Sequence, residues 1–167
     1  MIFGITLFTF VHVVISLVGI TSGFVVVWGM LTVKRLDMWT AVFLLTTVLT
    51  SVTGFFFPVE HFKPSHAVGI MSLLAMASAI FARYARILAG AWRTTYAISA
   101  VISLYFNVFV LVAQSFDKVQ KLKAMAPTQS EPPFLVAQVL VLGLFVALGI
   151  LATIRFRNEA APRTVMA

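Results

Sequence analysis

The Lys and Arg residues of this chain gather in clusters that lie about one membrane crossing apart. They number 12, and they separate long runs of apolar residues. A hydrocarbon core of about 30 Å takes about 20 residues of helix. Hydrophobic residues make up 61% of the chain and charged residues 10%, against about 45–50% and about 25% in soluble domains. The pattern therefore predicts an all-α, polytopic membrane protein.

Cutting the chain at charges and turn residues divides it into apolar runs. There are five, at about 4–33, 38–57, 67–88, 94–116 and 134–154. Each is long enough to cross the bilayer as a helix. We therefore expect a single domain, 1–167, that forms a bundle of five transmembrane helices. The third and fourth runs are divided only by a tight turn at Ala89-Gly90-Ala91. Without that turn the chain would form a four-helix variant.

The basic residues divide unequally between alternate connections, which predicts an orientation. One side of the membrane collects eight of them: Lys34, Arg35, Arg83, Arg86, Arg93, Arg155, Arg157 and Arg163. The other side collects four: Lys63, Lys118, Lys121 and Lys123. Cytoplasmic loops carry an excess of Lys and Arg. We therefore expect a multi-pass protein of the bacterial cytoplasmic (inner) membrane, with its amino terminus outside and its carboxyl terminus inside.

Charge and composition also restrict the classes of function. The net charge is +7, but the basic residues sit at the ends of apolar runs and form no continuous stripe of the kind that binds nucleic acid. The chain has no Cys, which excludes disulfides and thiol catalysis. No nucleotide loop and no placeable Ser-His-Asp grouping is present. We expect a non-enzymatic protein whose partners are the lipid bilayer and a larger membrane complex or a second copy, and no nucleic acid.

Small residues mark one face of the first run. Ser16, Gly19 and Gly23 lie at helical spacing, and the two glycines form a G-x-x-x-G pattern. Such residues allow neighbouring helices in a membrane to approach closely. We expect this face to point into the bundle and to form a helix-packing contact.

Scarce polar residues fall at one predicted depth. Counting outward at 1.5 Å per residue from the predicted cytoplasmic charges places His12, His66, Gln114 and Gln138 at about 26–33 Å. The level is near the outer interface, so these four residues are expected to form an outer-side polar pocket that binds a cofactor. Further ionisable residues lie in the outer loops just above: Glu60, His61, Asp117 and Glu131.

The chemistry of this layer leaves several ligands open. His12 and His66 could hold a b-type haem by its axial positions, and His and Gln side chains could bind the head group of a quinone or of a lipid-like ligand. His12, His61 and His66 with Glu60 could bind copper or zinc. Intramembrane ionisable groups are candidates for function because they are costly there unless paired.

The positions of the histidines relative to glycines carry a resemblance. His12 followed by Gly19 and Gly23, and His66 followed by Gly69, resembles small bacterial membrane proteins of b-type cytochrome character. The resemblance covers two runs. A dihaem cytochrome of that kind has four matched histidines and this chain has three, so the resemblance implies at most one bis-histidine haem.

Three functions follow from these patterns. The first is an accessory or ligand-binding membrane subunit whose outer-side pocket accepts a haem, a quinone or a lipid-like molecule. The second is a b-type membrane cytochrome with His12 and His66 as axial ligands. The third is a small transporter, which Asn107 and the threonines of run 38–57 favour. No charged residue at mid-depth is present to couple ions.

Overall fold

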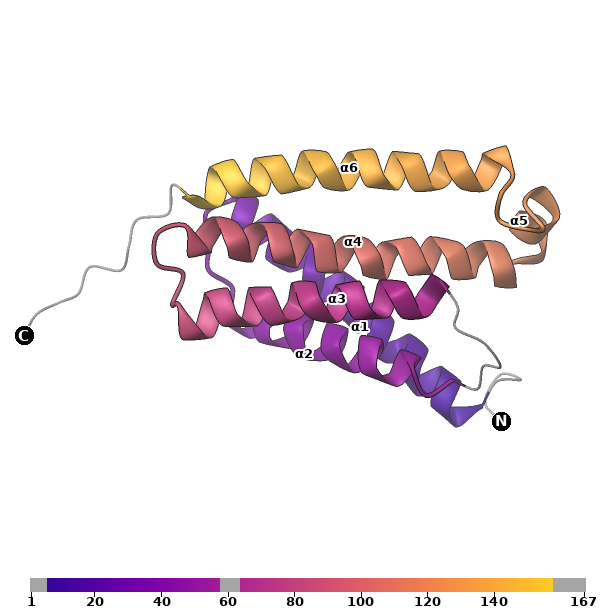
Figure 1. The fold of residues 1–167 in the computed structure, drawn as a ribbon, viewed down its shortest axis with the longest axis horizontal. Coiled ribbons are helices and arrows are strands. Elements are labelled where there is room, and N and C mark those ends of the chain that lie inside the picture. The colour runs from indigo at the N-terminus through magenta and orange to yellow at the C-terminus, as the bar shows by residue number, and fades with distance from the viewer. Residues whose placement is uncertain (1–5, 58–63, 158–167) are drawn as a thin grey trace, which may run out of the picture.

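A computed structural model of the chain describes residues 6–57 and 64–157. These residues are helical, and this part of the chain contains no β-strand. In chain order the elements are α1 (Leu7–Leu31), α2 (Asp37–Gly54), α3 (Pro64–Ile80), the π-helix η1 (Phe81–Ala85), α4 (Trp92–Lys118), α5 (Gln120–Met125) and α6 (Pro132–Arg157). The long helices run side by side as a bundle, and η1 continues α3 (Figure 1).

Four helical segments are long and apolar enough to cross a membrane. They are Leu7–Leu31, His66–Ala85, Trp92–Lys118 and Pro132–Phe156. The second combines most of α3 with η1. Among the long helices, α2 is not in this set. It has 18 residues, begins at Asp37 and carries several hydroxyl side chains. The crossing of the membrane by α2, and with it the count of five spans, stays a prediction.

The third and fourth apolar runs form separate helices that pack against each other. The turn between them contains three residues with left-handed backbone: Ile87 (φ 49°), Leu88 (φ 55°) and Gly90 (φ 54°). The Nε–H of Arg93 donates a hydrogen bond to the Leu88 carbonyl at 3.1 Å. The third and fourth runs therefore do not join into one helix, which is how the four-helix variant was expected to arise.

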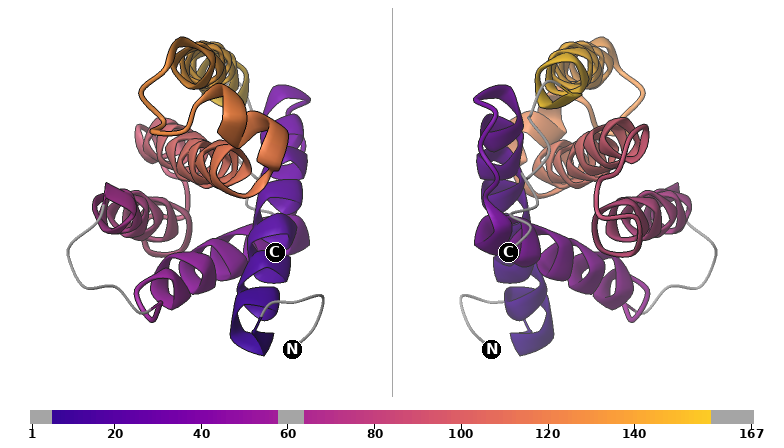
Figure 2. Two further views of the ribbon diagram at one scale, coloured as in Figure 1. Left: turned by 90° about the vertical axis from the view of Figure 1, so that its right-hand side faces the viewer. Right: turned by 90° about the vertical axis from the view of Figure 1, so that its left-hand side faces the viewer.

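Helix α4 lies at the centre of the bundle and contacts α1, α2, α3 and α6 (Figure 2). The α1–α2 turn, the η1–α4 turn and the last turn of α6 gather at one end of the bundle (Figure 1). This end, which we call the basic end, carries Lys34, Arg35, Arg83 and Arg155. The opposite end carries the start of α1, helix α5 and the start of α6.

Two glycines allow α1 to approach α2 and α4. A Cβ atom on Gly23 would lie 2.6 Å from Leu104 Cδ1 and 2.9 Å from Phe43 Cε2. A Cβ atom on Gly19 would lie 3.2 Å from Thr46 Oγ1. The small-residue face of α1 thus points at its two neighbours. Ser16 lies one turn earlier and donates its hydroxyl to the carbonyl of His12 at 2.7 Å.

A buried polar contact joins α4 to α2 at the level of these glycines. Asn107 Nδ2 donates a hydrogen bond to Thr47 Oγ1 at 3.1 Å, and both side chains are buried. A Cβ atom on Gly19 would lie 3.7 Å from the same Nδ2. Half of the hydroxyl groups of α1 and α2 bond instead to backbone carbonyls of their own helix, as Thr46 does to Val42 at 2.7 Å. The polar side chains here serve helix packing.

Candidate functional site

His12 is joined to the end of α2. Its Nδ1 lies 2.8 Å from Thr53 Oγ1, and its ring meets the ring of Phe57 edge-on with centroids 5.0 Å apart. The Thr53 hydroxyl donates to the Leu49 carbonyl at 2.6 Å. The hydrogen between His12 and Thr53 is therefore assigned to Nδ1, which leaves Nε2 as the acceptor nitrogen of the neutral ring.

His66 lies in the first turn of α3, on another side of α2. Its ring stacks on Phe55 with centroids 5.6 Å apart and an interplanar angle of 15°. Thr53 and Phe55 are two residues apart, so they point about 200° apart around the helix axis. The end of α2 therefore lies between the two histidine rings, and the structure does not bring His12 and His66 together.

The two glutamines lie elsewhere at the opposite end. Gln114 is exposed on α4. Gln138 on α6 is 8% exposed, and its Nε2 donates to the Phe109 carbonyl at 3.2 Å, while its Oε1 has no hydrogen-bond partner. Figure 1 shows the start of α1, which carries His12, running away from α6. The four residues of the predicted pocket are therefore distributed around this end of the bundle.

The predicted metal ligands are only partly described. Glu60 and His61 lie outside the described residues. Within residues 6–57 and 64–157, no group of three or more His, Asp or Glu side chains has a geometry that could hold a metal ion. The copper or zinc site stays a prediction from the sequence.

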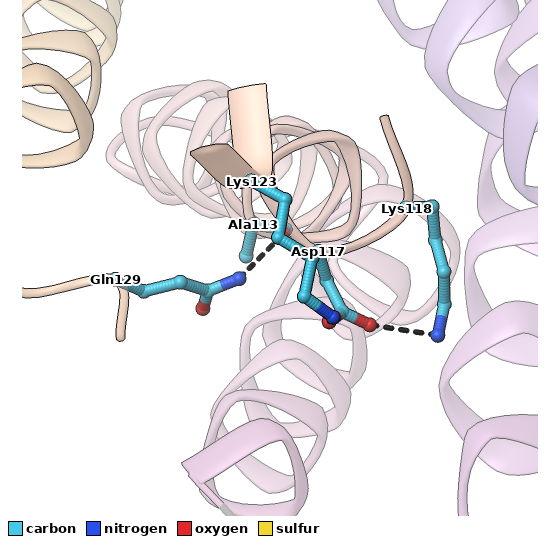
Figure 3. A network of polar contacts seen from close by, with 5 residues as sticks. All are labelled: Ala113, Asp117, Lys118, Lys123 and Gln129. Atoms are coloured by element: carbon cyan, nitrogen blue, oxygen red, sulfur yellow. Dashed lines mark hydrogen bonds and ion pairs between the residues drawn. The ribbon is translucent and has the colours of Figure 1, made fainter. Parts of the chain in front are cut away.

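Asp117, in the last turn of α4, is engaged with nearby partners (Figure 3). Asp117 forms ion pairs with Lys118 at 2.7 Å and with Lys123 at 3.4 Å. Beside them, Gln129 Nε2 donates to the Ala113 carbonyl at 2.8 Å and ties the loop to α4. These contacts show a local structural role for the loop.

Glu131 closes the same loop just before α6. Desolvation acts to raise the pKa of its carboxyl. Hydrogen bonds from the Thr128 hydroxyl and from the backbone N–H groups of Thr128 and Ser130 outweigh that effect and hold the pKa below its usual value. The carboxylate is thus stabilised as a loop-capping group by its own neighbours.

The basic end contains a buried arginine. Arg83 is 7% exposed and forms an ion pair with Asp37 at the start of α2. Its guanidinium carbon lies 5.3 Å from the centroid of the Tyr96 ring and 5.8 Å from that of Tyr84. Guanidinium groups stack favourably on aromatic faces. The sequence predicted Arg83 as one of several charges facing the cytoplasm, and the structure places it inside the bundle.

The buried Arg83 lies within a π-helix. Five-residue hydrogen bonds widen the turn at Phe81–Ala85, as in the bond from Arg86 N–H to the Phe81 carbonyl at 3.0 Å. An extra residue per turn changes the direction of the side chains that follow, and such segments are frequent at functional sites. The sequence offers one signal for this pair that went unused: Asp37 and Arg83 both lie beside connections on the same predicted side.

A small cavity, the basic-end pocket, lies beside Arg83. Its volume is about 10 Å³. Its polar lining residues are Lys34, Arg35, Thr40, Arg83 and Tyr96, and its apolar ones are Val26, Met30, Leu36 and Phe156. The Tyr96 hydroxyl donates to Thr40 Oγ1 over a long 3.4 Å. The pocket joins charged residues from two separate segments of the chain, the α1–α2 turn and η1.

A larger, apolar groove lies between α4 and α6, with a volume of about 430 Å³. It is lined by Ile98, Val101, Ile102 and Tyr105 of α4 and by one face of α6 between Leu142 and Ile154. Among all its lining residues, only Tyr105 and Thr153 carry polar side-chain atoms. Neither this groove nor the basic-end pocket is lined by His12, His66, Gln114 or Gln138.

Four apolar helices of spanning length, packed as a bundle, define the class of this chain as a small multi-pass membrane protein. Comparison with protein families, with curated proteins and with solved structures finds no match to the chain. The groove and the pocket are therefore the features from which a function can be inferred.

Proposed function

We propose that the protein is a non-enzymatic, ligand-binding subunit of the bacterial inner membrane, and that its ligand is a lipid-like molecule held in the groove between α4 and α6. The observation that carries the proposal is the groove itself: about 430 Å³ of space with an almost wholly apolar lining. Apolar concave sites bind ligands that present hydrocarbon surface.

The position of the groove favours a single hydrocarbon chain as its occupant. It lies on the outer face of two helices that could span the membrane, so hydrocarbon is the medium around it. Its α6 wall runs from Leu142 to Ile154, which is about 18 Å of helix. That length is about half of a hydrocarbon core of about 30 Å. The groove therefore matches one leaflet, the one at the basic end, whereas a partner helix would lie along the full span.

Gly149 provides a direct test of the groove. It lies in the groove wall, and a Cβ atom there would meet only Val101 Cγ1 at 3.6 Å, an ordinary contact. Gly149→Leu should fill the space and reduce cross-linking of a photoactivatable phospholipid at this site several-fold. Gly143→Leu is the matched control, since Gly143 lies on the same helix and has no atom within 4 Å of its Cβ position.

Two outcomes of this experiment carry opposite meanings. Loss of cross-linking in the Gly149 variant alone, with both variants monodisperse in detergent, would support the groove as the binding site. Equal cross-linking of the wild type and both variants would show that the groove holds no specific lipid chain.

The cytochrome alternative predicts a coloured protein. It requires His12 and His66 to ligate one haem, yet the end of α2 lies between their rings. We therefore expect purified protein from haem-supplied cells to lack a Soret band. A Soret band that disappears in His12→Ala and in His66→Ala would establish the cytochrome instead. The quinone and transporter hypotheses stay predictions from the sequence.

A further inference from the structure

The basic-end pocket carries an excess of positive charge. Lys34, Arg35 and Arg83 are among its lining residues. Of these three, Arg83 forms an ion pair, with Asp37. Lys34 and Arg35 are exposed, and no hydrogen bond or ion pair joins their side chains to the described residues. Within residues 6–57 and 64–157, two cations therefore have no paired acid beside a buried third, an arrangement that attracts an anion.

The backbone holds Lys34 and Arg35 in a defined place. Helix α1 ends in a pair of overlapping hydrogen bonds, from Lys34 N–H to the Gly29 carbonyl at 2.8 Å and from Val33 N–H to the Met30 carbonyl at 3.4 Å. Val33 adopts a left-handed φ of 56°. That conformation is unfavourable for a β-branched residue, and such strain is often retained at functional positions. The turn is therefore ordered rather than a free linker.

The guanidinium of Arg83 is preorganised for binding an anion. Its burial, its ion pair with Asp37 and its stacking on Tyr96 restrict the guanidinium to one place. A guanidinium has five N–H donors, so one carboxylate leaves donors for a second acceptor. Because the Arg83 side chain is already restricted in the free protein, binding of an anion costs less conformational entropy than binding to a mobile arginine would.

The size of the pocket limits which part of an anion can enter. A volume of about 10 Å³ is close to the minimum for one water molecule. A single oxygen atom fits there, in a space whose lining includes Thr40, Arg83 and Tyr96. The rest of a tetrahedral phosphate would remain at the mouth of the pocket, beside Lys34 and Arg35.

We propose that the basic-end pocket binds a phosphate group, supplied by the headgroup of an anionic phospholipid. The pocket lies where the helices end and the bilayer's headgroups begin, and basic pockets between transmembrane helices recognise such headgroups. One phosphate oxygen enters beside Arg83, and Lys34 and Arg35 hold the others. This site is separate from the α4–α6 groove and does not depend on it.

The test uses the full chain in detergent, with bound lipid counted by native mass spectrometry. Phosphatidylglycerol should bind more tightly than phosphatidylcholine. The double variant Lys34→Gln/Arg35→Gln should lose about 30-fold in affinity for phosphatidylglycerol, since each basic residue contributes about a factor of five near anionic lipid. The matched control is Lys121→Gln/Lys123→Gln, which makes the same charge change at the opposite end and should change the affinity less than twofold.

The remaining outcomes decide the source of the phosphate. Competition by millimolar inorganic phosphate would overturn the lipid headgroup as the source and assign the pocket to a free ion. Equal binding of the two phospholipids, or an equal loss in both double variants, would overturn the site. Gly149→Leu should leave the preference for phosphatidylglycerol unchanged, so failure of the groove proposal and failure of this one can be distinguished.

Discussion

Gly23→Val should destabilise the bundle by about 1–3 kcal/mol, because a side chain at this position has no space. The Cβ position lies 2.6 Å from Leu104 and 2.9 Å from Phe43, which come from α4 and α2. Both neighbours are almost fully buried, so neither can move aside without displacing other core side chains. Valine would push α1 away from two helices at once. The free energy of unfolding in mixed micelles measures the loss.

The control for this variant is Gly143→Val. It adds the same side chain to another long helix, at a position where no atom lies within 4 Å of the added Cβ. It should remain close to the wild type in stability. If both variants unfolded at the same denaturant concentration as the wild type, the prediction would be wrong. Close packing of α1 at Gly23 would then not contribute to stability.

Tyr96→Ala should cost about 3–5 kcal/mol, the loss expected when a large buried aromatic side chain is removed. Tyr96 is 1% exposed, and its ring lies 5.8 Å from that of Phe156 and 5.3 Å from the Arg83 guanidinium. The truncation would leave a cavity and would remove the aromatic ring on which the buried Arg83 guanidinium stacks. Denaturant unfolding of the purified variant provides the measurement.

Two variants separate the ring of Tyr96 from its hydroxyl and from its neighbourhood. Tyr96→Phe keeps the ring and loses the contacts of its hydroxyl, a long 3.4 Å bond to Thr40 and a contact with Arg83, so it should cost about 1 kcal/mol. Tyr84→Ala removes a ring that also lies near Arg83 but is 56% exposed, and it should cost little. A Tyr96→Ala variant no less stable than Tyr84→Ala would contradict the role of Tyr96 in the core.

The positions of His12 and His66 show which properties could be predicted by counting residues along a helix and which could not. Depth could be predicted, because a helix rises by a constant 1.5 Å per residue, and His12 and His66 do lie toward the same end. The direction in which each side chain points around the bundle could not be predicted, because it depends on which helices neighbour each other. Helix α2 contacts both α1 and α3 and lies between the two rings.

Arg83 illustrates the same limit at the basic end. Its position beside a connection was evident from the sequence, and so was the interruption of the apolar run. Its burial depends on the π-helical turn and on the proximity of Asp37, Tyr96 and the α1–α2 turn. These groups are far apart in the chain, and no local pattern predicts that they meet.

The sequence by itself determined the helical class, the approximate ends of the long helices and the small-residue face of α1. Those properties follow from composition and from the regular period of a helix, which act locally. Only the tertiary structure decided which polar groups share a pocket, how α4 and α6 form an apolar groove, and that Arg83 is buried. Those properties depend on the packing of helices against one another, where one rotation or one π-helical turn changes which side chains meet.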